Sequence, residues 1–536
     1  MTFSRWSVPG DRHCRRAELL WVLGLSLCLA CCGGPGEPDI SVPFDVVEAT
    51  IGDIQDAITS GRVTCRSVVQ TYLDRIETYD QSTGLNAITV VNPNALRRAD
   101  EIDAALEGSR EQGALFCAPI LVKDNFDTHD LPTTGGSIVL KESYPPDDAF
   151  MVRMIREAGA IVIAKTNMAE WAFSPRRTES SSFGVTANAY ALDRVPAGSS
   201  GGTASGVAAS FGVAGLGTDT GNSIRGPSSH LALFGIRSTI GLTSRDGVIP
   251  LAFDRDIAGP MTRTVEDGAR LFNVVAGYDP ADPFTEPDKR EPDYTAFLDV
   301  DGLNGARVGV LRALVDTDDA DPQVTALFNQ AIEDMRAAGA EIVQPIIVPG
   351  FQEHLDSRKF CDRFRYDMYL YLQSLGEQAP IRDVIEVLET GQHSPYVKQS
   401  LERFAKRPLE TAPEDWEEPC LPYPANPLRN AFLEDVTAAM DAAEVDVLLY
   451  PTWTNPPAHL DKPRAEYKGD NSQLVAPATG MPAATVPMGY THGTLPAGLQ
   501  ILARRYDEGM IFRIAYAYEQ LTRHRHVPDG FPPLIQ

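Results

Sequence analysis

The body of the chain opens with two patterns of helical spacing. A helix is expected after Thr64 and another after Asn92-Pro93, because a capping residue or a helix-starting proline precedes apolar positions three and four residues apart. The apolar positions are Val68, Val69, Tyr72, Leu73 and Ile76 in the first helix, and Leu96, Ala99, Ile102 and Leu106 in the second. Each pattern predicts a helix that packs on a core by one face.

Short, continuous apolar runs follow these helices. Residues 118–122 and 160–164 are predicted strands, and residues 150–158 between them have the pattern of an amphipathic helix. The order strand, helix, strand predicts an α/β sheet. Small residues at 203–209 predict a helix pressed closely against that sheet, and residues 213–217 predict a further strand.

Composition and charge limit the class of protein. Of 536 residues, 43% are hydrophobic and 22% are charged, which is typical of a soluble globular body. That length is enough for several domains, but no linker divides the chain, so a single body over residues 46–530 is expected. The net charge of −26 disfavours nucleic acid and anionic lipid as partners.

The N-terminal segment has a different character. Residues 1–32 carry four arginines followed by an apolar run that ends in Leu29-Ala30-Cys31-Cys32, which predicts a signal peptide with a lipobox-like end. Cys31 and Cys32 are both lipidation candidates, and residues 33–45, rich in Gly and Pro, are the expected tether. We therefore expect export from a bacterial cytoplasm as a membrane-anchored lipoprotein, with an uncleaved anchor or a non-lipidated signal as alternatives.

Four cysteines lie in the body of the chain, Cys65, Cys117, Cys361 and Cys420. Their spacing is not that of a metal site. Isolated buried thiols are the favoured interpretation, and a Cys361–Cys420 pair is the alternative in an oxidising compartment.

Candidate chemistry lies in two glycine-rich loops, Gly198-Ser199-Ser200-Gly201-Gly202 and Gly217-Thr218-Asp219-Thr220-Gly221-Asn222-Ser223-Ile224-Arg225. A serine hydroxyl is a weak nucleophile at neutral pH and needs a base to take its proton. His230, the histidine nearest to a loop serine, is interpreted as a packed side chain. Lys123 and Lys165 end the two predicted strands, where open α/β sheets place their chemistry.

The order of these motifs resembles the amidase signature family. The matching segments are Val122-Lys123-Asp124-Asn125 after an apolar strand, then Gly-Ser-Ser-Gly-Gly, then Asp-x-Gly-x-Ser-Ile-Arg at 219–225. The resemblance covers residues 50–280 and 440–520. It implies an α/β fold with a large central mixed twisted β-sheet covered by helices on both sides, a small linear carboxamide as substrate, and no cofactor or metal.

The resemblance also assigns roles. Ser223 is the nucleophile that forms an acyl ester, and the backbone N–H groups of Thr220, Gly221 and Asn222 form the oxyanion hole. Ser199, preceded by a cis peptide bond, relays a proton to Lys123. Ser200 is the alternative candidate for this relay, but in the family the first serine of the pair has that role. Lys123 must be neutral to accept the proton, so its pKa must be lowered by burial. Lys165 matches a family segment without a proton-transfer role.

Two departures from the commonest family pattern concern the substrate pocket. Asn222 stands where the family usually has a glycine, and the turn can still form because asparagine tolerates positive φ. Ala197 stands where the family usually has a glycine before the first loop. The Asn222 side chain either narrows the pocket or bonds the adjacent backbone. Trp171 and Phe173 match positions that line the acyl pocket, with a core position as the alternative for each.

Residues 281–440 show little resemblance and are expected to pack on the sheet and shape the pocket. Their clearest signals are a helix at 321–338, a strand at 341–346 and a Pro-rich segment at 419–427. The same catalytic residues also suit a carbamate, urea-type or ester hydrolase. A catalytically silent binding lipoprotein and a glutaminase subunit of a tRNA amidotransferase are less favoured alternatives.

Overall fold

The computed structural model describes residues 44–108, 112–357 and 360–534. The predicted signal peptide, with Cys31 and Cys32, and the tether up to residue 43 lie outside these residues. Within the described ranges, no helix has both the length and the apolar character needed to cross a bilayer.

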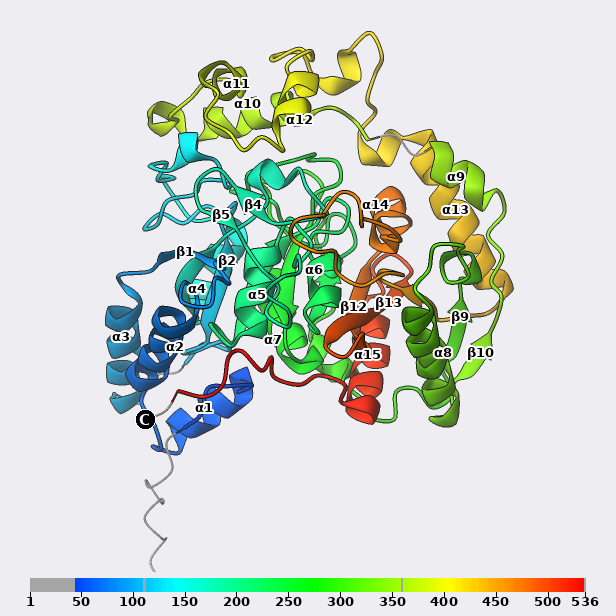
Figure 1. The fold of residues 1–536 in the computed structure, drawn as a ribbon, viewed down its shortest axis with the longest axis horizontal. Helices are drawn as coiled ribbons and strands as arrows, with labels where there is room; N and C mark the ends of the chain where they lie inside the picture. The colour runs from blue at the N-terminus through cyan, green and yellow to red at the C-terminus, as the bar shows by residue number, and fades with distance from the viewer. Residues whose placement is uncertain (1–43, 109–111, 358–359, 535–536) are drawn as a thin grey trace, which may run out of the picture. The chain divides into compact units, whose positions relative to one another are not determined.

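An eleven-stranded mixed sheet forms the centre of the described residues, in the order β1-β3-β2-β6-β8-β7-β12-β13-β11-β9-β10 (Figure 1). Its strands are β1 (Ile88–Val91), β2 (Pro119–Lys123), β3 (Ile161–Thr166), β6 (Ala214–Thr218), β7 (Phe234–Arg237), β8 (Ala258–Thr262), β9 (Arg307–Val310), β10 (Glu341–Val343), β11 (Val447–Pro451), β12 (Ala483–Thr491) and β13 (Leu495–Ala503). A separate pair consists of β4 (Glu179–Ser180) and β5 (Gly184–Val185). Strands β3, β2 and β6 are mutually parallel, and so are β11, β9 and β10, whereas the middle of the sheet is antiparallel.

Helices cover both faces of this sheet, which is why every residue of β2, β3 and β6 is buried. The helices are α1 (Ile51–Thr59), α2 (Cys65–Tyr79), α3 (Ala95–Glu107), α4 (Phe150–Glu157), α5 (Gly201–Ala208), α6 (Arg225–His230), α7 (Val265–Val275), α8 (Pro322–Ala337), α9 (Phe351–Ser357), α10 (Phe364–Ser374), α11 (Ile385–Thr390), α12 (Lys398–Phe404), α13 (Pro427–Ala442), α14 (Ala476–Thr479) and α15 (Glu508–Thr522). The predicted α/β fold with a mixed central sheet is confirmed.

Local sequence signals explain where several of these helices begin. Thr64 caps α2 as predicted: its side chain accepts the N–H of Ser67. The Ser67 side chain in turn accepts the N–H of Thr64, which completes a capping box. Asp321 accepts the N–H groups of Gln323 and Val324 at the start of α8. The hydrogen bonds made by these side chains fix helix ends that apolar periodicity alone leaves imprecise.

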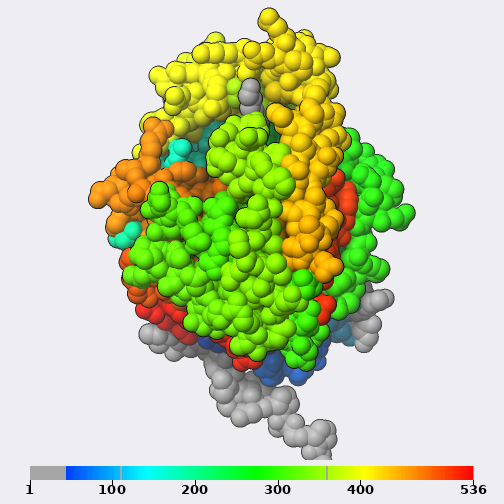
Figure 2. Space-filling view, turned by 90° about the vertical axis from the view of Figure 1, so that its right-hand side faces the viewer, coloured from blue at the N-terminus to red at the C-terminus, as the bar shows by residue number. Residues whose placement is uncertain are grey.

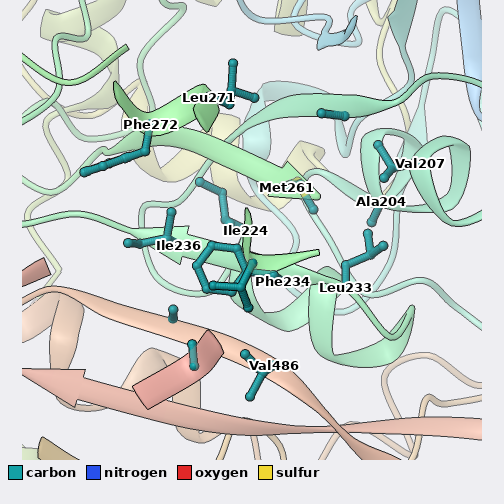
Figure 3. Packing of buried hydrophobic residues seen from close by; sticks show 14 of the residues in the cluster. Ala204, Val207, Ile224, Leu233, Phe234, Ile236, Met261, Leu271, Phe272 and Val486 are labelled. Atoms are coloured by element: carbon teal, nitrogen blue, oxygen red, sulfur yellow. The ribbon is translucent and has the colours of Figure 1, made fainter. Parts of the chain in front are cut away.

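The main core includes Ile224, a residue of the second serine loop (Figure 3). Ile224, the residue after Ser223, packs in the same buried cluster as Phe234 and Ile236 of β7 and Ala204 of α5. Small residues let α5 approach closely: a Cβ atom on Gly202 would lie 2.2 Å from the Asn167 carbonyl oxygen. The prediction of a helix pressed against the sheet at 203–209 is therefore confirmed.

Residues 281–440 contribute strands to the central sheet and helices that pack around it. Strands β9 and β10 extend the sheet beside β11. The predicted strand at 341–346 ends at Val343, because Pro345 has no N–H to continue the ladder. Helices α10, α11 and α12 lie together in Figure 1, and their apolar residues form a second core cluster with Trp171 and Ile249. Helix α13, which Asn426 caps and Pro427 starts, was not predicted.

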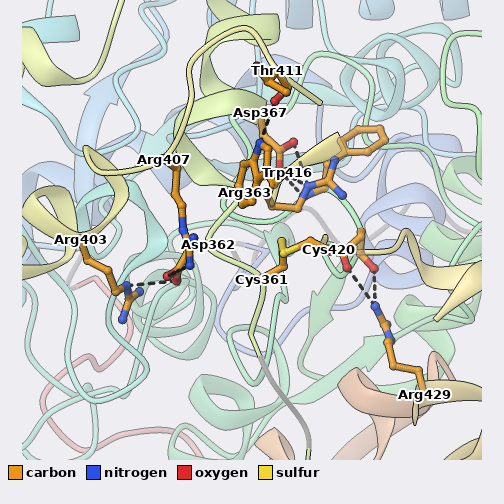
Figure 4. The surroundings of a disulfide bond; sticks show 12 residues. Cys361, Asp362, Arg363, Asp367, Arg403, Arg407, Thr411, Trp416, Cys420 and Arg429 are labelled. Carbon is orange, nitrogen blue, oxygen red and sulfur yellow. Dashed lines mark hydrogen bonds and ion pairs between the residues drawn. A yellow bond between two sulfur atoms is a disulfide. The ribbon is translucent and has the colours of Figure 1, made fainter. Parts of the chain in front are cut away.

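Two disulfides join the four cysteines of the body, Cys65–Cys117 and Cys361–Cys420. The favoured interpretation of isolated thiols is therefore wrong, whereas the alternative pairing of Cys361 with Cys420 is correct. Figure 4 shows that charged groups surround the second disulfide: Asp362 pairs with Arg403 at 3.1 Å and with Arg407 at 3.3 Å. Disulfide and ion pairs together tie the segment after residue 360 to α12 and to the Pro-rich segment.

Candidate active site

Two adjacent strand ends create the candidate site. Strands β2 and β6 are parallel neighbours, so their last residues, Lys123 and Thr218, lie at the same edge of the sheet. Lys123 Nζ donates a hydrogen bond of 2.7 Å to Thr218 Oγ1 and another of 2.8 Å to Ser199 Oγ. The structure thus brings Lys123 and Ser199 together, although 76 positions separate them in the chain.

The first serine loop is held by backbone contacts on both sides. The Gly198–Ser199 peptide bond is cis, as the resemblance implies. The Gly198 N–H donates to Pro175 O at 3.0 Å, and Ser199 O accepts the N–H of Ala169 at 3.0 Å. A Cβ atom on Gly198 would lie 2.5 Å from the carbonyl oxygens of Ser174 and Arg177, so this position requires glycine.

The two serines of this loop have different partners. Ser200 Oγ donates to Thr218 O at 3.2 Å and accepts the Thr218 N–H at 3.3 Å, so its hydroxyl is bound to the backbone of β6. The Ser199 hydroxyl instead accepts a hydrogen bond from Lys123. This difference favours Ser199 over Ser200 as the group that exchanges a proton with lysine.

The environment of Lys123 favours its neutral form. Complete burial lowers the pKa of Lys123 to about 7, although the more distant carboxylates of Asp256 and Asp219 act to raise it. Among the described residues, no carboxylate lies within ion-pair distance of its Nζ atom. A large fraction of Lys123 is therefore uncharged near neutral pH, which is what a general base requires.

Lys165 is a useful contrast. Its Nζ atom donates to Phe126 O at 2.7 Å, Thr133 Oγ1 at 2.9 Å and Thr128 Oγ1 at 3.1 Å, and lies 3.8 Å from Asp124. These groups surround the ammonium and place it against a carboxylate. Lys165 holds the turn after β2 together, and the structure gives it no contact with either serine loop.

A buried ion-pair cluster fixes the loop that carries Ser223. Asp219, at the start of this loop, lies 3.1 Å from both Arg225 and Arg237, and all three side chains are fully buried. These two arginines hold the pKa of Asp219 below its usual value despite the opposing effect of burial. Arg225 Nη2 also donates to Gly221 O at 2.8 Å, so the motif Asp-x-Gly-x-Ser-Ile-Arg stabilises its own turn.

Ser223 lies next to these groups and lines a cavity of about 630 Å³. Its Oγ donates to Asn222 Oδ1 at 3.3 Å, and its carbonyl oxygen accepts the N–H of Ser200 at 3.3 Å. Within the described part of the chain, no hydrogen bond joins the hydroxyls of Ser223 and Ser199. A rotation of the Ser223 side chain away from Asn222 is therefore needed before a proton can pass between the two serines.

The predicted oxyanion-hole residues Thr220, Gly221 and Asn222 line the same cavity. Backbone hydrogen bonds secure the loop at its ends, from Asp219 N–H to Ile257 O at 2.7 Å and from Gly226 N–H to Asn222 O at 2.7 Å. No backbone–backbone hydrogen bond of the described residues uses the N–H of Thr220, Gly221 or Asn222. These donors stand beside Ser223, the predicted nucleophile, where a developing oxyanion would need them.

Phe173 and Trp171 have different positions. Phe173 lines the cavity, whereas Trp171 is 1% exposed and packs edge-on against Phe364, with ring centroids 5.9 Å apart. The core alternative therefore applies to Trp171, which supports the cavity wall from behind. His230 is likewise a packed side chain: its ring lies 4.5 Å from that of Trp453, and burial lowers the pKa of His230 to about 3.

The two departures from the family pattern have unexpected backbone angles. Asn222 is not among the described residues with positive φ, so its tolerance of that region is not used and this part of the interpretation is wrong. Ala197, in contrast, has φ of 63°. The Asn222 side chain faces the cavity, and its Nδ2 donates to Asp470 Oδ2 at 3.1 Å and Pro175 O at 3.3 Å.

Sequence reasoning missed several residues of the site. Thr218 contacts Lys123, and Asp256 accepts a hydrogen bond from the Thr220 hydroxyl. Asp470 and Tyr467 reach the cavity from the segment before α14. Thr218 lies within the second serine loop, so its position could have been noticed, but nothing in the local sequence indicates that Asp256 or residues 467–470 approach this loop.

Two segments that line the cavity lie on the face shown in Figure 2. The segment around residues 360–410 (yellow) and the segment around 455–475 (orange) border a hollow in which cyan to teal atoms from the earlier part of the chain are visible. Phe360 and Phe404 line the cavity from the first segment, and Tyr467 lines it from the second. The insert at 281–440 thus forms part of the cavity wall, as its predicted role requires.

One group of side chains in the described residues has the spacing of a metal site, His129, Asp130 and Asp148. Arg156 lies 2.5 Å from Asp130 and 3.2 Å from Asp148. Both carboxylates are therefore already paired with one guanidinium group, and none of the three side chains lines the Ser223 cavity.

Comparison with known proteins gives a consistent result. A family model described as Amidase matches residues 67–512. The chain is 35% identical over 493 residues to a glutamyl-tRNA(Gln) amidotransferase subunit of Gloeobacter violaceus, covering 89% of this chain and 98% of that protein. Among solved structures, native peptide amidase from Stenotrophomonas maltophilia has 32% identity and a TM-score of 0.79, covering 91% of this chain and 100% of that one. The glutamyl-tRNA(Gln) amidotransferase subunit from Thermotoga maritima has 26% identity and a TM-score of 0.69, covering 89% and 96%.

Proposed function

The chain belongs to the amidase family, and on that premise we propose that it is a hydrolase that cleaves carboxamide C–N bonds through an acyl ester of Ser223. The single observation that carries this proposal is the buried Lys123, whose pKa of about 7 and 2.8 Å hydrogen bond to Ser199 suit it to accept a proton beside the Ser223 cavity. Burial also lowers the pKa of Lys165, to about 8, but its Nζ atom lies beside the Asp124 carboxylate and contacts neither serine loop.

In the proposed reaction, Ser223 Oγ bonds to the carbonyl carbon while its proton passes to Ser199 and the Ser199 proton passes to Lys123. The N–H groups of Thr220, Gly221 and Asn222 stabilise the oxyanion. The C–N bond then breaks, and the amine leaves with the proton returned from Lys123 through Ser199. Water hydrolyses the Ser223 ester by the same relay, which regenerates the enzyme.

Both a peptide amidase and a component of an amidotransferase are similar to this chain, so two classes of amide are candidate substrates. We favour hydrolysis of a small free amide, because a net charge of −26 opposes binding to tRNA. Glutaminase activity is the second candidate, supported by the 35% identity to the amidotransferase component over nearly its full length. Glutamine turnover by the purified chain, with ammonia as product, tests that candidate directly.

The decisive experiment incubates the purified protein with primary amides, anilides, peptide amides, carbamates and esters. Mass spectrometry of trapped protein and of products then identifies the acyl group on Ser223 and the bond that breaks. An acyl-Ser223 adduct from amides supports the proposal. Adducts from carbamates or esters alone replace it with the alternative hydrolase, and failure of a fluorophosphonate to label Ser223 favours a silent binding protein.

We further propose that the protein is exported and lipid-anchored through Cys31 or Cys32, as the N-terminal sequence predicts. The two disulfides support an oxidising compartment. A Cys31→Ser/Cys32→Ser double variant is expected to leave the membrane fraction of a bacterial host. If that variant stays in the membrane fraction, lipid anchoring is wrong.

A further inference from the structure

The cavity beside Ser223 has a charge opposite to that of the whole chain. Three arginines line it, Arg176, Arg255 and Arg403, whereas Asp470 is the sole carboxylate among the described residues that line it. The chain as a whole carries a net charge of −26. A basic cavity in an acidic protein concentrates anions at that place and needs a specific explanation.

The carboxylate of Asp470 does not serve as a counter-charge for a ligand. It accepts hydrogen bonds from Tyr467 Oη at 2.8 Å, Ser472 Oγ at 2.5 Å and Asn222 Nδ2 at 3.1 Å. Burial raises the pKa of Asp470 to about 6. Its oxygens are therefore engaged by the protein, and they hold Tyr467 and Asn222 in the cavity wall.

Arg176 differs from the other cationic side chains of the wall. Its guanidinium lies 5.0 Å from the centre of the Tyr467 ring, and among the described residues that guanidinium makes no hydrogen bond and no ion pair. Arg403, in contrast, is neutralised by Asp362 at 3.1 Å. Stacking on an aromatic face leaves the N–H edge of a guanidinium available to a second partner.

The backbone holds Arg176 close to the reacting groups. The carbonyl oxygen of its neighbour Pro175 accepts the Gly198 N–H at 3.0 Å and Asn222 Nδ2 at 3.3 Å. Pro175 therefore bridges the two serine loops. Arg176, the next residue, lines the same cavity as Ser223.

We propose that the amides cleaved at Ser223 carry a carboxylate, and that Arg176 is the specificity-determining residue that binds it. This inference rests on the proposed amidase function. The planar guanidinium offers two parallel N–H donors to a carboxylate, a geometry that a neutral substrate cannot use. In a cavity partly shielded from water, such a charge-assisted pair favours the anionic substrate over a neutral analogue of the same shape.

Two matched pairs of substrates test the proposal. Succinamate and 4-oxopentanamide differ by a carboxylate in the acyl part, and 4-acetamidobenzoate and 4-acetamidoacetophenone differ in the same way in the leaving group. In at least one pair, we expect the wild-type kcat/KM for the anionic member to exceed that for the neutral member by about tenfold or more at low salt. Raising the ionic strength should reduce this preference.

Arg176→Gln should remove the preference, lowering kcat/KM about tenfold for the anionic member and less than about twofold for the neutral one. Arg336→Gln, which removes an exposed arginine on α8, is the matched control and should change neither. Equal or better turnover of the neutral member in both pairs overturns the proposal. The proposal is also overturned if Arg176→Gln lowers kcat/KM by the same factor for the anionic and the neutral member of each pair.

A binding readout covers substrates that turn over slowly. At least one of the two anionic substrates, succinamate or 4-acetamidobenzoate, should protect Ser223 of the wild type, but not of Arg176→Gln, from a fluorophosphonate. Absence of this difference for both substrates overturns the proposal. If the enzyme shows no preference for anionic substrates but neutral amides still acylate Ser223, the proposed amidase function remains valid. If no amide of any charge acylates Ser223, both proposals fail.

Discussion

Lys123 Nζ lies 2.8 Å from Ser199 Oγ, and its other hydrogen-bond partner, Thr218, is also a neutral hydroxyl. Two hydroxyls solvate a neutral amine well but do not compensate an ammonium charge in a buried site. This relationship distinguishes Lys123 from Lys165, which lies beside a carboxylate and backbone carbonyl groups. Two lysines at the ends of neighbouring parallel strands, Lys123 as the last residue of β2 and Lys165 as the last but one of β3, thus have different surroundings.

The pKa of Lys123 predicts the pH dependence of amide turnover. Burial lowers this pKa to about 7, and the protonated lysine cannot accept a proton, so activity must be lost as the pH falls. We expect kcat/KM for a neutral amide to decrease about tenfold per pH unit below pH 7 and to level off above it. Measurement of kcat/KM with a neutral amide across this range checks the prediction, and a profile that stays flat well below pH 6 contradicts it.

Matched substitutions of the two lysines should have opposite consequences. Lys123→Met is expected to lower kcat by about 10²- to 10⁴-fold, because it removes the general base. Its free energy of unfolding should stay within about 1 kcal/mol of the wild type, since it exchanges a disfavoured buried amine for an apolar chain of similar size. Residual activity is measured with a primary amide, and stability is measured by urea unfolding.

Lys165→Met is the companion variant. It leaves the buried carboxylate of Asp124 without its cation and leaves the oxygens of Phe126, Pro132 and Thr133 without their donor. We expect it to lower the free energy of unfolding by about 3–5 kcal/mol. Similar stability losses for the two variants would contradict the assignment of Lys165 as the structural lysine.

The sequence predicts the strands and the catalytic candidates because their signals are local. The apolar runs that end at Lys123 and Lys165 identify two strands, and the order of motifs identifies Ser199 and Ser223. The partners of Ser223 are less predictable, because Asp470 and Tyr467 approach it from the far end of the chain through the fold alone. Similarly, cysteine spacing does not indicate that Cys65 meets Cys117, since the fold brings the start of α2 to the turn before β2.

The insert illustrates a second limit of sequence reasoning. Helix α8 has a capping aspartate and clear apolar periodicity, and it forms where expected. Strand β9 has four residues and α12 has seven, lengths at which periodicity does not distinguish one element from another. Their positions depend on contacts with β11 and with the Trp171 cluster rather than on local preference.

Removal of the two disulfides should affect the enzyme in different ways. Each closes a loop of similar length, with sequence separations of 52 and 59 residues, so loss of either should lower the free energy of unfolding by about 4 kcal/mol in the chain-entropy model. Cys361 adjoins Phe360, which lines the cavity, whereas Cys65 starts α2. Cys361→Ser/Cys420→Ser should therefore raise KM severalfold for the best amide, and the other double variant should not. Equal KM values for the two double variants would contradict a role of the Cys361–Cys420 disulfide in shaping the cavity.

Ala197 offers a substitution that should stabilise the protein. Its φ of 63° lies in the left-handed region, where a side chain costs about 1–2 kcal/mol and glycine costs nothing. We expect Ala197→Gly to raise the free energy of unfolding by about 1 kcal/mol. Ala326→Gly, at an exposed position within α8, is the control and should lower it by about 1 kcal/mol. Urea unfolding gives both values, and destabilisation by Ala197→Gly would contradict the backbone argument.

Asn222 controls both the nucleophile and the size of the cavity. Its Oδ1 accepts the Ser223 hydroxyl at 3.3 Å, and its Nδ2 donates to Asp470, so the side chain competes with Ser199 for the Ser223 proton and occupies space beside it. Asn222→Gly should free the hydroxyl and widen the cavity. The ratio of kcat/KM for a branched acyl amide to that for acetamide is expected to rise about tenfold or more, because one or two methylene groups of added space are worth that factor.

Asn222→Ala separates the two effects. It removes the acceptor of the Ser223 hydroxyl as the glycine variant does, but it keeps Cβ and leaves the backbone freedom of the loop unchanged. If the alanine variant gains the same preference for branched acyl groups, the volume of the amide group sets the specificity. A gain confined to the glycine variant assigns the effect to loop flexibility. A gain in neither variant means that Asn222 does not limit the acyl group, and the wall formed by Phe173 and Phe404 then does.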